Sequence, residues 1–174
     1  MNTVRLLMLA DYLESVGQFE GRGVPKNKFD LQLWMATYNK FERKFKIKAD
    51  PNKDTFVHKT KKFNGITYNI AHPVECQTAG CAVGWATSMP EFNKLGLYLD
   101  AFEHSPIYFD KNDKCTYYST TAVCAFFHID GVIFCELFLK KFYTEKQSRD
   151  PVAVAQRIRE VVNNYLIAKT TLTT

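Results

Sequence analysis

The sequence predicts an α+β fold that is mainly α: a single compact helical domain with one or two small antiparallel β-hairpins. Three observations lead to this prediction. Apolar residues recur at spacings of three and four in several segments, which is typical of amphipathic helices. An Asn-Gly pair stands between two runs rich in β-branched and aromatic residues, which indicates a hairpin. The 174 residues contain neither an internal repeat nor a long linker, so we expect one domain over residues 1–174.

The first predicted helix covers residues 4–16. Thr3 is a suitable N-cap for it. Five apolar residues then follow on one face at helical spacing: Leu6, Leu9, Ala10, Leu13 and Val16. Gly17 comes directly afterwards and can adopt the left-handed conformation that ends many helices. We therefore expect this helix to pack its apolar face into the core.

A second helix is predicted over residues 31–45, with Asp30 as its N-cap. Aromatic and apolar residues recur in it at steps of three and four: Leu31, Trp34, Tyr38, Phe41 and Phe45. The far end is ambiguous, because residues 44–48 alternate lysine with an apolar residue, which is the pattern of a strand. The sequence leaves this boundary open.

Two hairpins are predicted. Residues 55–70 are rich in Phe, Val, Thr, Tyr and Ile, and Asn64-Gly65 in their middle favours a two-residue type I′ turn. The second hairpin has arms at residues 107–109 and 114–118, since aromatic segments flank the polar turn 110–113. Both hairpins are small, so the expected fold remains mainly helical.

Between the hairpins, residues 78–88 are predicted to form a short buried helix. The run 76–86 is rich in small residues, Trp85 is large enough to anchor a core, and Pro90 would end the helix. Each glycine in this run weakens an isolated helix by about 1 kcal/mol. We expect close packing of the helix against its neighbours to offset that loss.

Three further helices are predicted over residues 120–127, 131–142 and 151–167. Each follows a residue with good capping chemistry: Ser119, Asp130 and Asp150. Pro151 occupies the first helical position, which proline favours. The Thr-rich end, residues 169–174, is expected to fray.

The net charge of +5 is concentrated in one segment, residues 40–62, which we call the basic segment. It contains nine basic and three acidic residues, a balance of +6, so the rest of the chain is close to −1. This distribution excludes a uniformly basic, histone-like protein and an acidic mimic of DNA. Binding to a polyanion would therefore depend on the basic segment.

No segment has the pattern of an export signal or a membrane span. The apolar run at residues 6–10 is ended by Asp11, which makes it too short for a signal peptide. The most apolar stretch, residues 122–138, is interrupted by polar residues before it reaches the roughly 18 apolar residues of a span. We therefore expect a cytoplasmic protein that does not bind membranes, with five reduced cysteines. No cofactor is expected.

One cysteine pair raises the question of chemistry. Cys76 and Cys81 are separated by four residues and His72 precedes them, so ligand types for a Zn²⁺ ion are present. A thiolate nucleophile at Cys76 is a second alternative, because a helix N-terminus lowers a thiol pKa. Neither a second cysteine pair nor an oxyanion hole can be placed from the sequence. We favour a role in which Cys76 and Thr78 bond the free N–H groups at the start of the helix. The structural motif is then Cys76, Thr78, Cys81, Gly84 and Trp85.

The basic segment and the strand after it offer a binding surface. Aromatic residues are interleaved with the cations there, and single-strand nucleic-acid binders combine these two residue types. The candidate binding residues are Lys40, Arg43, Lys44, Lys46, Lys48, Lys59, Lys61, Lys62, Phe63 and Tyr68. Alternation along a hairpin would equally turn the aromatics inward under a solvated lysine face. An acidic protein surface suits these charges as well as a nucleic acid does.

The central motif resembles that of a known family. Residues 76–86 read C-Q-T-A-G-C-A-V-G-W-A, which is similar to the C-G-T-x-x-C-x-x-G-W-A core of a family of small uncharacterised proteins from bacteria and their phages. Gln77 stands where that family usually has Gly. Weaker likenesses extend to three other segments: 29–31, 125–129 and 151–162. Residues 39–72 look like an insertion relative to the family. The resemblance implies a bacterial or phage origin and no chemistry.

Together these features predict a non-enzymatic interaction protein. With the phage origin that the resemblance implies, the leading hypothesis is binding to a host macromolecule through the basic, aromatic-rich segment, with inhibition of a host or defence factor as one outcome. The partner would be a host protein with an acidic surface, in the host cytoplasm. A single-stranded DNA- or RNA-binding protein is the first alternative. A small Cys- or Zn-dependent enzyme is the second.

Overall fold

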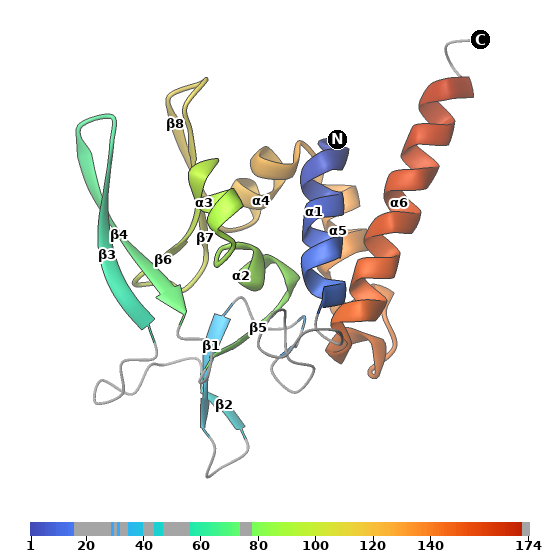
Figure 1. The fold of residues 1–174 in the computed structure, drawn as a ribbon, viewed down its shortest axis with the longest axis horizontal. Coiled ribbons are helices and arrows are strands. Elements are labelled where there is room, and N and C mark those ends of the chain that lie inside the picture. Colours follow the sequence, from blue (N-terminus) through green and yellow to red (C-terminus); the bar gives the residue numbers. More distant parts are fainter. Residues whose placement is uncertain are drawn as a thin grey trace.

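The computed structural model combines two antiparallel sheets with six α-helices in the part of the chain that it describes (Figure 1). The described residues are 1–15, 29, 31, 35–39, 44–46, 56–73 and 78–171. The helices are α1 Thr3–Glu14, α2 Ala82–Ala86, α3 Pro90–Lys94, α4 Ser119–Phe127, α5 Gly131–Phe138 and α6 Pro151–Thr171. The larger sheet forms one side of the molecule, α1, α5 and α6 form the other, and α2, α3 and α4 lie between them.

Five antiparallel strands form the larger sheet, in the order β3-β4-β6-β7-β8. They are β3 Phe56–Phe63, β4 Ile66–Pro73, β6 Leu97–Asp100, β7 Pro106–Asp110 and β8 Cys115–Tyr118. Both predicted hairpins are present, as β3–β4 and β7–β8, but β6 joins them into one sheet. The predicted fold class, mainly α with one or two small hairpins, is therefore wrong. The fold is α+β and its principal sheet has five strands.

Strand β6 could not be recognised from the sequence because both of its faces are covered. Leu97, Tyr98 and Leu99 are all buried, so the segment lacks the alternation of apolar and polar residues that marks a half-exposed strand. An apolar run this short is also compatible with a turn of helix. Its pairing with β4 and β7 decides the conformation.

The turn of the β3–β4 hairpin is of the predicted two-residue kind. Phe63 and Ile66 are paired across it, and Asn64 and Gly65 have φ of 50° and 80°. Positive φ at both central residues is the property of a type I′ turn, for which Asn-Gly is a favoured sequence. This element of the prediction is confirmed.

The second sheet stands where a helix was expected. Strands β1 Met35–Asn39 and β2 Lys44–Lys46 pair with each other, and β1 also pairs with β5 Thr78–Gly80. The prediction of a helix over residues 31–45 is therefore wrong. A helix would place Tyr38 and Phe45 on one face, whereas the antiparallel register sets them directly opposite each other. Spacing alone does not separate these arrangements, and pairing with the remote strand β5 favours the sheet.

Helix α1 has the predicted amphipathic face. Its buried residues are Leu6, Leu9, Ala10 and Leu13. The cap is Asn2 instead of Thr3, because Asn2 Oδ1 accepts the backbone N–H of Arg5 at 3.1 Å. Val16 and the expected stop at Gly17 lie outside the described residues. The prediction of the helix itself is confirmed.

The predicted helix over residues 78–88 is divided into separate elements. Thr78–Gly80 forms β5, α2 covers only Ala82–Ala86, and Pro90 begins α3 instead of ending a helix. The prediction is wrong at its start because β1 supplies hydrogen bonds to β5 that a helix would otherwise have to make internally. Pro90 is tolerated in the first turn of α3, where its missing N–H would have no helical partner.

The three C-terminal helices match their predicted segments, with changes at the ends. Asp130 caps α5 as expected, since its Oδ1 accepts the N–H of Ile133 at 2.8 Å. Tyr118, not Ser119, occupies the cap position of α4. Helix α5 ends early and a 3₁₀ turn at Lys140–Phe142 follows it. Helix α6 is longer than predicted.

Alternation along the central strands separates two groups of buried side chains on the two faces of the larger sheet. Leu97, Leu99 and Tyr108 point toward the helices and belong to the main core. Tyr98, Ile107 and Phe109 point the other way and form a second, smaller cluster with Ile70. Phe63 and Tyr68 pack against this smaller cluster, which we call the Phe109 cluster.

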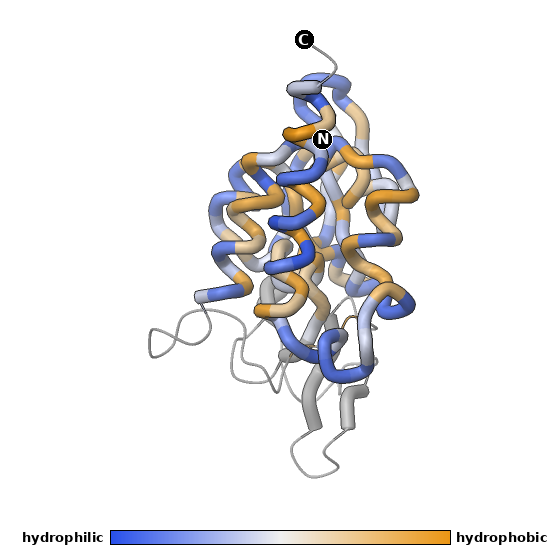
Figure 2. Tube along the Cα trace, turned by 90° about the vertical axis from the view of Figure 1, so that its right-hand side faces the viewer, coloured by the Kyte–Doolittle hydropathy of each residue, from blue (hydrophilic) through white to orange (hydrophobic). Residues whose placement is uncertain are grey.

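The main core is held by aromatic contacts between the helices. The rings of Phe92, Phe126 and Phe127 meet edge to face, with centroids 5.0 to 5.9 Å apart. Trp85 of α2 is 2% exposed and lies in the same core. Figure 2 shows hydrophobic and hydrophilic stretches alternating along the helices, as expected for helices that bury one face.

Among the described residues, no helix is by itself long and apolar enough to cross a membrane. Helices α4 and α5 reach the required length and composition only when they are taken together. They are bent by 101° at the break between them.

Candidate macromolecule-binding surface

Part of the basic segment forms a lysine-rich edge of the larger sheet. Lys59, Lys61 and Lys62 lie on β3, which is the terminal strand in the sheet order. Lys59 and Lys62 are exposed and Lys61 is half-buried. Among the described strands β3 pairs only with β4, and its other edge faces outward (Figure 1). This edge is the first component of the candidate surface.

Strand alternation gives the β3–β4 hairpin two different faces. The register sets Lys59, Lys61 and Phe63 of β3 opposite Ile70, Tyr68 and Ile66 of β4. This face turns toward the Phe109 cluster. The other face carries four exposed polar residues: Thr60, Lys62, Thr67 and Asn69. Lysines therefore project on both sides of the strand.

The two aromatic residues predicted to stack on a ligand pack inward. The ring centroids of Phe63 and Tyr68 lie 5.2 and 4.8 Å from that of Phe109. The hydroxyl of Tyr68 lies 3.2 Å from Thr116 Oγ1 on β8. Both side chains are half-buried. Their rings are engaged within the protein, which disfavours base stacking by these two residues.

Lys61 lies at the border between this cluster and solvent. Its Nζ is 5.4 Å from the centroid of the Tyr98 ring. A cation–π contact of this kind contributes about 0.5–1 kcal/mol at an exposed site. The contact holds the Lys61 side chain near β6.

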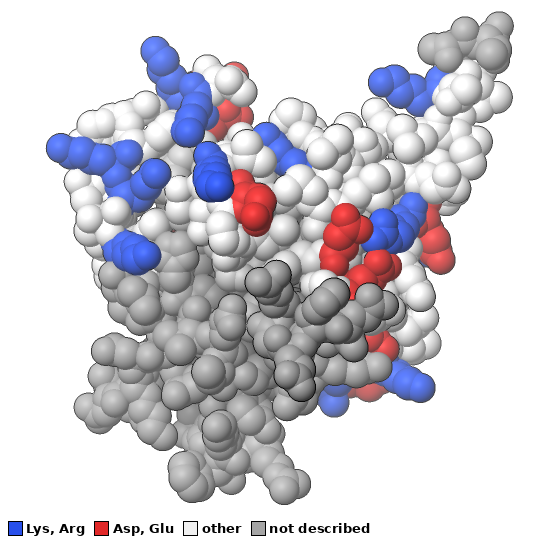
Figure 3. Space-filling model, viewed as in Figure 1, with Lys and Arg blue, Asp and Glu red and all other residues white. Residues whose placement is uncertain are grey.

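The tip of the β3–β4 hairpin touches a second turn, which carries lysines from another part of the chain. Asn64 Nδ2 donates to the carbonyl of Lys114 at 2.6 Å, so the β3–β4 turn touches the end of the β7–β8 turn. Lys111 Nζ in that turn lies 3.5 Å from the carbonyl of Lys94. Figure 3 shows Lys and Arg side chains gathered over these hairpins. We define the lysine face as Lys59, Lys61, Lys62, Lys94, Lys111 and Lys114.

Sequence reasoning missed Lys94, Lys111 and Lys114, and no local signal could have found them. They are far from β3 in the chain, and the turn at residues 110–113 carries acidic as well as basic residues. Asp110 is 8% exposed and its Oδ1 accepts the N–H of Asn112 at 2.8 Å, so this carboxylate is used within its own turn. Lys111 and Lys114 join the lysine face through the contact between the two turns, and Lys94 joins it through its contact with Lys111.

Five predicted binding residues remain, and the structure describes only two of them. Lys40, Arg43 and Lys48 lie outside the described residues. Lys44 and Lys46 belong to β2, which is in the smaller sheet. The structure therefore divides the described lysines of the basic segment between two sheets.

The cysteine motif contributes a helix cap. Cys81 is 3% exposed and its Sγ accepts the backbone N–H of Gly84 at 3.4 Å, at the start of α2. The role expected for Thr78 is corrected, because Thr78 lies in β5 and not at the start of the helix. Cys76 lies outside the described residues. The cap falls to Cys81 because β5 displaces the helix start toward the C-terminus.

The zinc alternative gains no support from the described part of the chain. His72 lies in β4, and the sulfur of Cys81 is engaged with Gly84. Within residues 1–15, 56–73 and 78–171 and the shorter described segments, no group of three or more His, Cys, Asp or Glu residues could hold a metal ion. No described arrangement therefore meets the ligand count of a structural zinc site.

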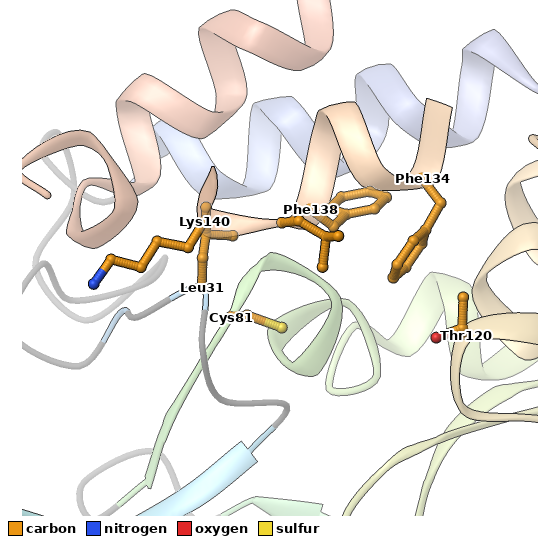
Figure 4. A pocket seen from close by; sticks show the side chains of 7 residues that line it. Leu31, Cys81, Thr120, Phe134, Phe138 and Lys140 are labelled. Atoms are coloured by element: carbon orange, nitrogen blue, oxygen red, sulfur yellow. The ribbon is translucent and has the colours of Figure 1, made fainter. Parts of the chain in front are cut away.

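A cavity of about 420 Å³ opens beside Cys81 (Figure 4). The described residues that line it are Leu31, Cys81, Thr120, Phe134, Phe138, Leu139 and Lys140. The amino group of Lys140 points away from Cys81 and pairs with Glu145 at 2.5 Å. None of these lining residues is His, Asp or Glu, so a Cys81 thiolate would find no general base among them.

The other three described cysteines are less buried than Cys81. Cys115 is exposed, and Cys124 and Cys135 are half-buried. Burial raises the pKa of the Cys124 thiol, and the negative charge of Asp130 raises that pKa further. A raised pKa keeps Cys124 in the thiol form, which is a weak nucleophile.

The candidate site is thus a charged surface on two touching hairpins. No family model, curated protein or solved structure matches the chain. We therefore interpret its function from the lysine face itself.

Proposed function

We propose that the chain is a non-enzymatic interaction protein that binds an acidic macromolecule through the lysine face. The observation that supports this most strongly is the gathering of six lysines from β3, the β7–β8 turn and the end of α3 on two touching hairpins and the helix beside them. A single exposed ion pair contributes little to binding. Several like charges on one surface create a field that steers and orients an oppositely charged partner.

A protein with an acidic surface suits this face better than a single-stranded nucleic acid does. Single-strand binders add exposed aromatic rings to their cations, whereas Phe63 and Tyr68 pack against Phe109. All six cations of the lysine face are lysines, which lack the planar fork that arginine uses for bidentate phosphate contacts. Both observations favour carboxylates as the groups recognised.

The resemblance of residues 76–86 to bacterial and phage proteins supports a partner in a bacterial cytoplasm. If a phage encodes the chain, the partner is a host protein. Occupation of that protein's acidic surface would then block the contacts which the surface makes with its own basic ligands. Inhibition of a host or defence factor is the expected consequence.

Charge reversal on β3 tests the proposal. The triple variant Lys59→Glu, Lys61→Glu, Lys62→Glu is expected to bind fluorescein-labelled poly-L-glutamate at least about tenfold more weakly than the wild type, because three attractions become repulsions. Fluorescence anisotropy at low salt measures the affinity. Binding should also weaken as salt rises, since exposed charges are screened beyond about 8–10 Å at physiological ionic strength.

A second triple variant separates position from net charge. Lys141→Glu, Lys146→Glu, Lys169→Glu makes the same change of charge at exposed positions outside the lysine face. It should retain nearly wild-type affinity. Equal losses in both triples would refute a localised site. Tighter binding to an oligothymidylate than to poly-L-glutamate would instead support the nucleic-acid alternative.

A further inference from the structure

We propose that the acidic partner binds as an extended strand that adds to the open edge of β3. This inference rests on the proposed function and specifies the form that the partner takes. Main-chain hydrogen bonds would supply affinity, and the lysines would select the partner by charge. The strand addition depends on which backbone N–H and C=O groups of β3 point to the open edge.

The two-residue turn fixes which backbone groups of β3 are already bonded. In such a hairpin the residues that flank the loop form a hydrogen-bonded pair, and bonded and non-bonded pairs alternate from there. Phe63 and Ile66 flank the turn. The positions of β3 that bond to β4 therefore include Phe63, Lys61 and Lys59. The positions whose N–H and C=O groups point to the outer edge include Lys62, Thr60 and His58.

A hydrogen bond on the other side of β4 confirms this alternation. Thr60 is paired with Asn69. The carbonyl of Asn69 accepts the N–H of Ala101 at 3.1 Å, so the backbone of Asn69 is directed away from β3 and toward the end of β6. In a non-bonded antiparallel pair both residues direct their backbone groups outward. Thr60 therefore presents its N–H and C=O to the open edge.

No described strand occupies that edge. β3 is terminal in the sheet order, and the described part of the chain contains no backbone hydrogen bond from Thr60 or Lys62 to a residue outside the hairpin. Thr60 and Lys62 are both exposed. An exposed row of unpaired backbone groups is a template for an additional strand.

A second copy of this chain is not the expected occupant. Antiparallel pairing of two β3 strands about Thr60 would set Lys59 of each strand opposite Lys61 of the other. Like charges directly opposite each other destabilise a ladder, and edge lysines are one means by which proteins prevent self-pairing. The same lysines attract a strand of opposite charge, so the edge discriminates between these two occupants.

The alternation also indicates where the acidic residues of the partner lie. In an antiparallel addition, Thr60 and Lys62 would exchange hydrogen bonds with the added strand, which leaves Lys59 and Lys61 in non-bonded pairs. In those pairs the Cα atoms are about 4.5 Å apart and side chains come closest. Lys59 and Lys61 project on one face, so their partners are two residues apart. The expected ligand is an extended segment with Asp or Glu at alternate positions.

Amide hydrogen exchange tests the strand addition directly. The probe is a seven-residue synthetic peptide with Glu at its third and fifth positions and Val or Thr elsewhere, added to the full chain. Exchange of the Thr60 and Lys62 amides, followed by NMR, should slow at least about tenfold at saturation, because these N–H groups gain acceptors. The Lys61 and Phe63 amides, already bonded to β4, should change little. Binding of the peptide without slowing at Thr60 and Lys62 would overturn the inference.

A proline variant with a matched control provides the second test. Thr60→Pro removes an outward N–H, and proline is tolerated where an edge-strand N–H faces solvent. It should weaken peptide binding about tenfold, because one main-chain hydrogen bond is lost and the adjacent one is weakened. Thr60→Val keeps the N–H and the branched shape and should bind like the wild type. Retained protection of Lys61 and Phe63 shows that the hairpin is intact in both variants.

The outcomes separate this inference from the proposed function. If Thr60→Pro binds the peptide as the wild type does while the Lys59, Lys61, Lys62 charge reversal abolishes binding, strand addition is wrong and the lysine face stands. If the charge reversal has no effect, both proposals fail. A peptide with Lys in place of Glu should not bind, and equal binding of the two peptides would contradict selection by charge.

Discussion

Replacement of Trp85 by alanine is expected to destabilise the protein by about 3–5 kcal/mol, the range for a large aromatic residue removed from a core. Trp85 is 2% exposed and lies in the main core on a helix of only five residues. So short a helix depends on packing, because it is too short to be stable alone. The free energy of unfolding, measured in urea by circular dichroism, checks the prediction.

The control for this variant is Phe102→Ala. Phe102 is 77% exposed, so its loss leaves no cavity and the free energy of unfolding should change by less than about 0.5 kcal/mol. A Trp85→Ala protein as stable as Phe102→Ala would contradict the position of α2 in the core.

Gly96→Ala is expected to lower the free energy of unfolding by about 1–3 kcal/mol from backbone strain alone, which is the second large effect. Gly96 has φ of 105°, a conformation that residues with a Cβ rarely adopt. An added Cβ would lie 2.4 Å from the carbonyl oxygen of Phe109. The two segments cannot separate freely, because the Gly96 carbonyl accepts the N–H of Phe109 at 2.9 Å. Urea unfolding measures the loss.

Gly131→Ala is the matched control for the glycine position. A Cβ at Gly131 would meet nothing within 4 Å, and Gly131 is the first residue of α5. Alanine favours a helix over glycine by up to about 1 kcal/mol, so this variant should be as stable as the wild type or slightly more stable. If the Gly96→Ala protein were also as stable as the wild type, the close approach of Gly96 to Phe109 of β7 would be wrong.

The elements that could be predicted are those with local signals. Helix α1 and helix α6 combine helical spacing with identifiable starts, and the Asn64-Gly65 pair determines its own turn. Strand β6 and strands β1 and β2 lack such signals, since their hydrogen-bond partners come from distant segments. Tyr38 and Phe45 would share one face of a helix and are also paired in the sheet, so their spacing is uninformative.

The candidate site could be predicted only in part, for a similar reason. Lys59, Lys61 and Lys62 follow from the composition of β3 and its alternation. The inward packing of Phe63 and Tyr68 requires Phe109, which is more than 40 residues away in the chain. Lys94, Lys111 and Lys114 join the face only through the Asn64 contact and its neighbours. Long-range contacts therefore determine both the shape of the face and half of its charges.

Protection of a sheet edge is the simplest other role for the β3 lysines. Lysines on an edge strand discourage aggregation, and Lys59, Lys61 and Lys62 satisfy that role without any partner. Protection of the β3 edge does not account for Lys94, Lys111 and Lys114, which lie at the end of α3 and in the β7–β8 turn. The contact of Lys114 with the β3–β4 turn and that of Lys94 with Lys111 favour a surface that recognises acidic groups.

Lysine acetylation of the wild-type chain, with and without saturating poly-L-glutamate, tests the lysine face most directly. Mass spectrometry gives the modification rate at each lysine, and no substitution is needed. The rates at Lys59, Lys62, Lys111 and Lys114 are expected to fall severalfold, while those at Lys141, Lys146 and Lys169 stay unchanged. Protection spread evenly over both groups, or confined to the second group, would contradict the assignment of binding to the lysine face.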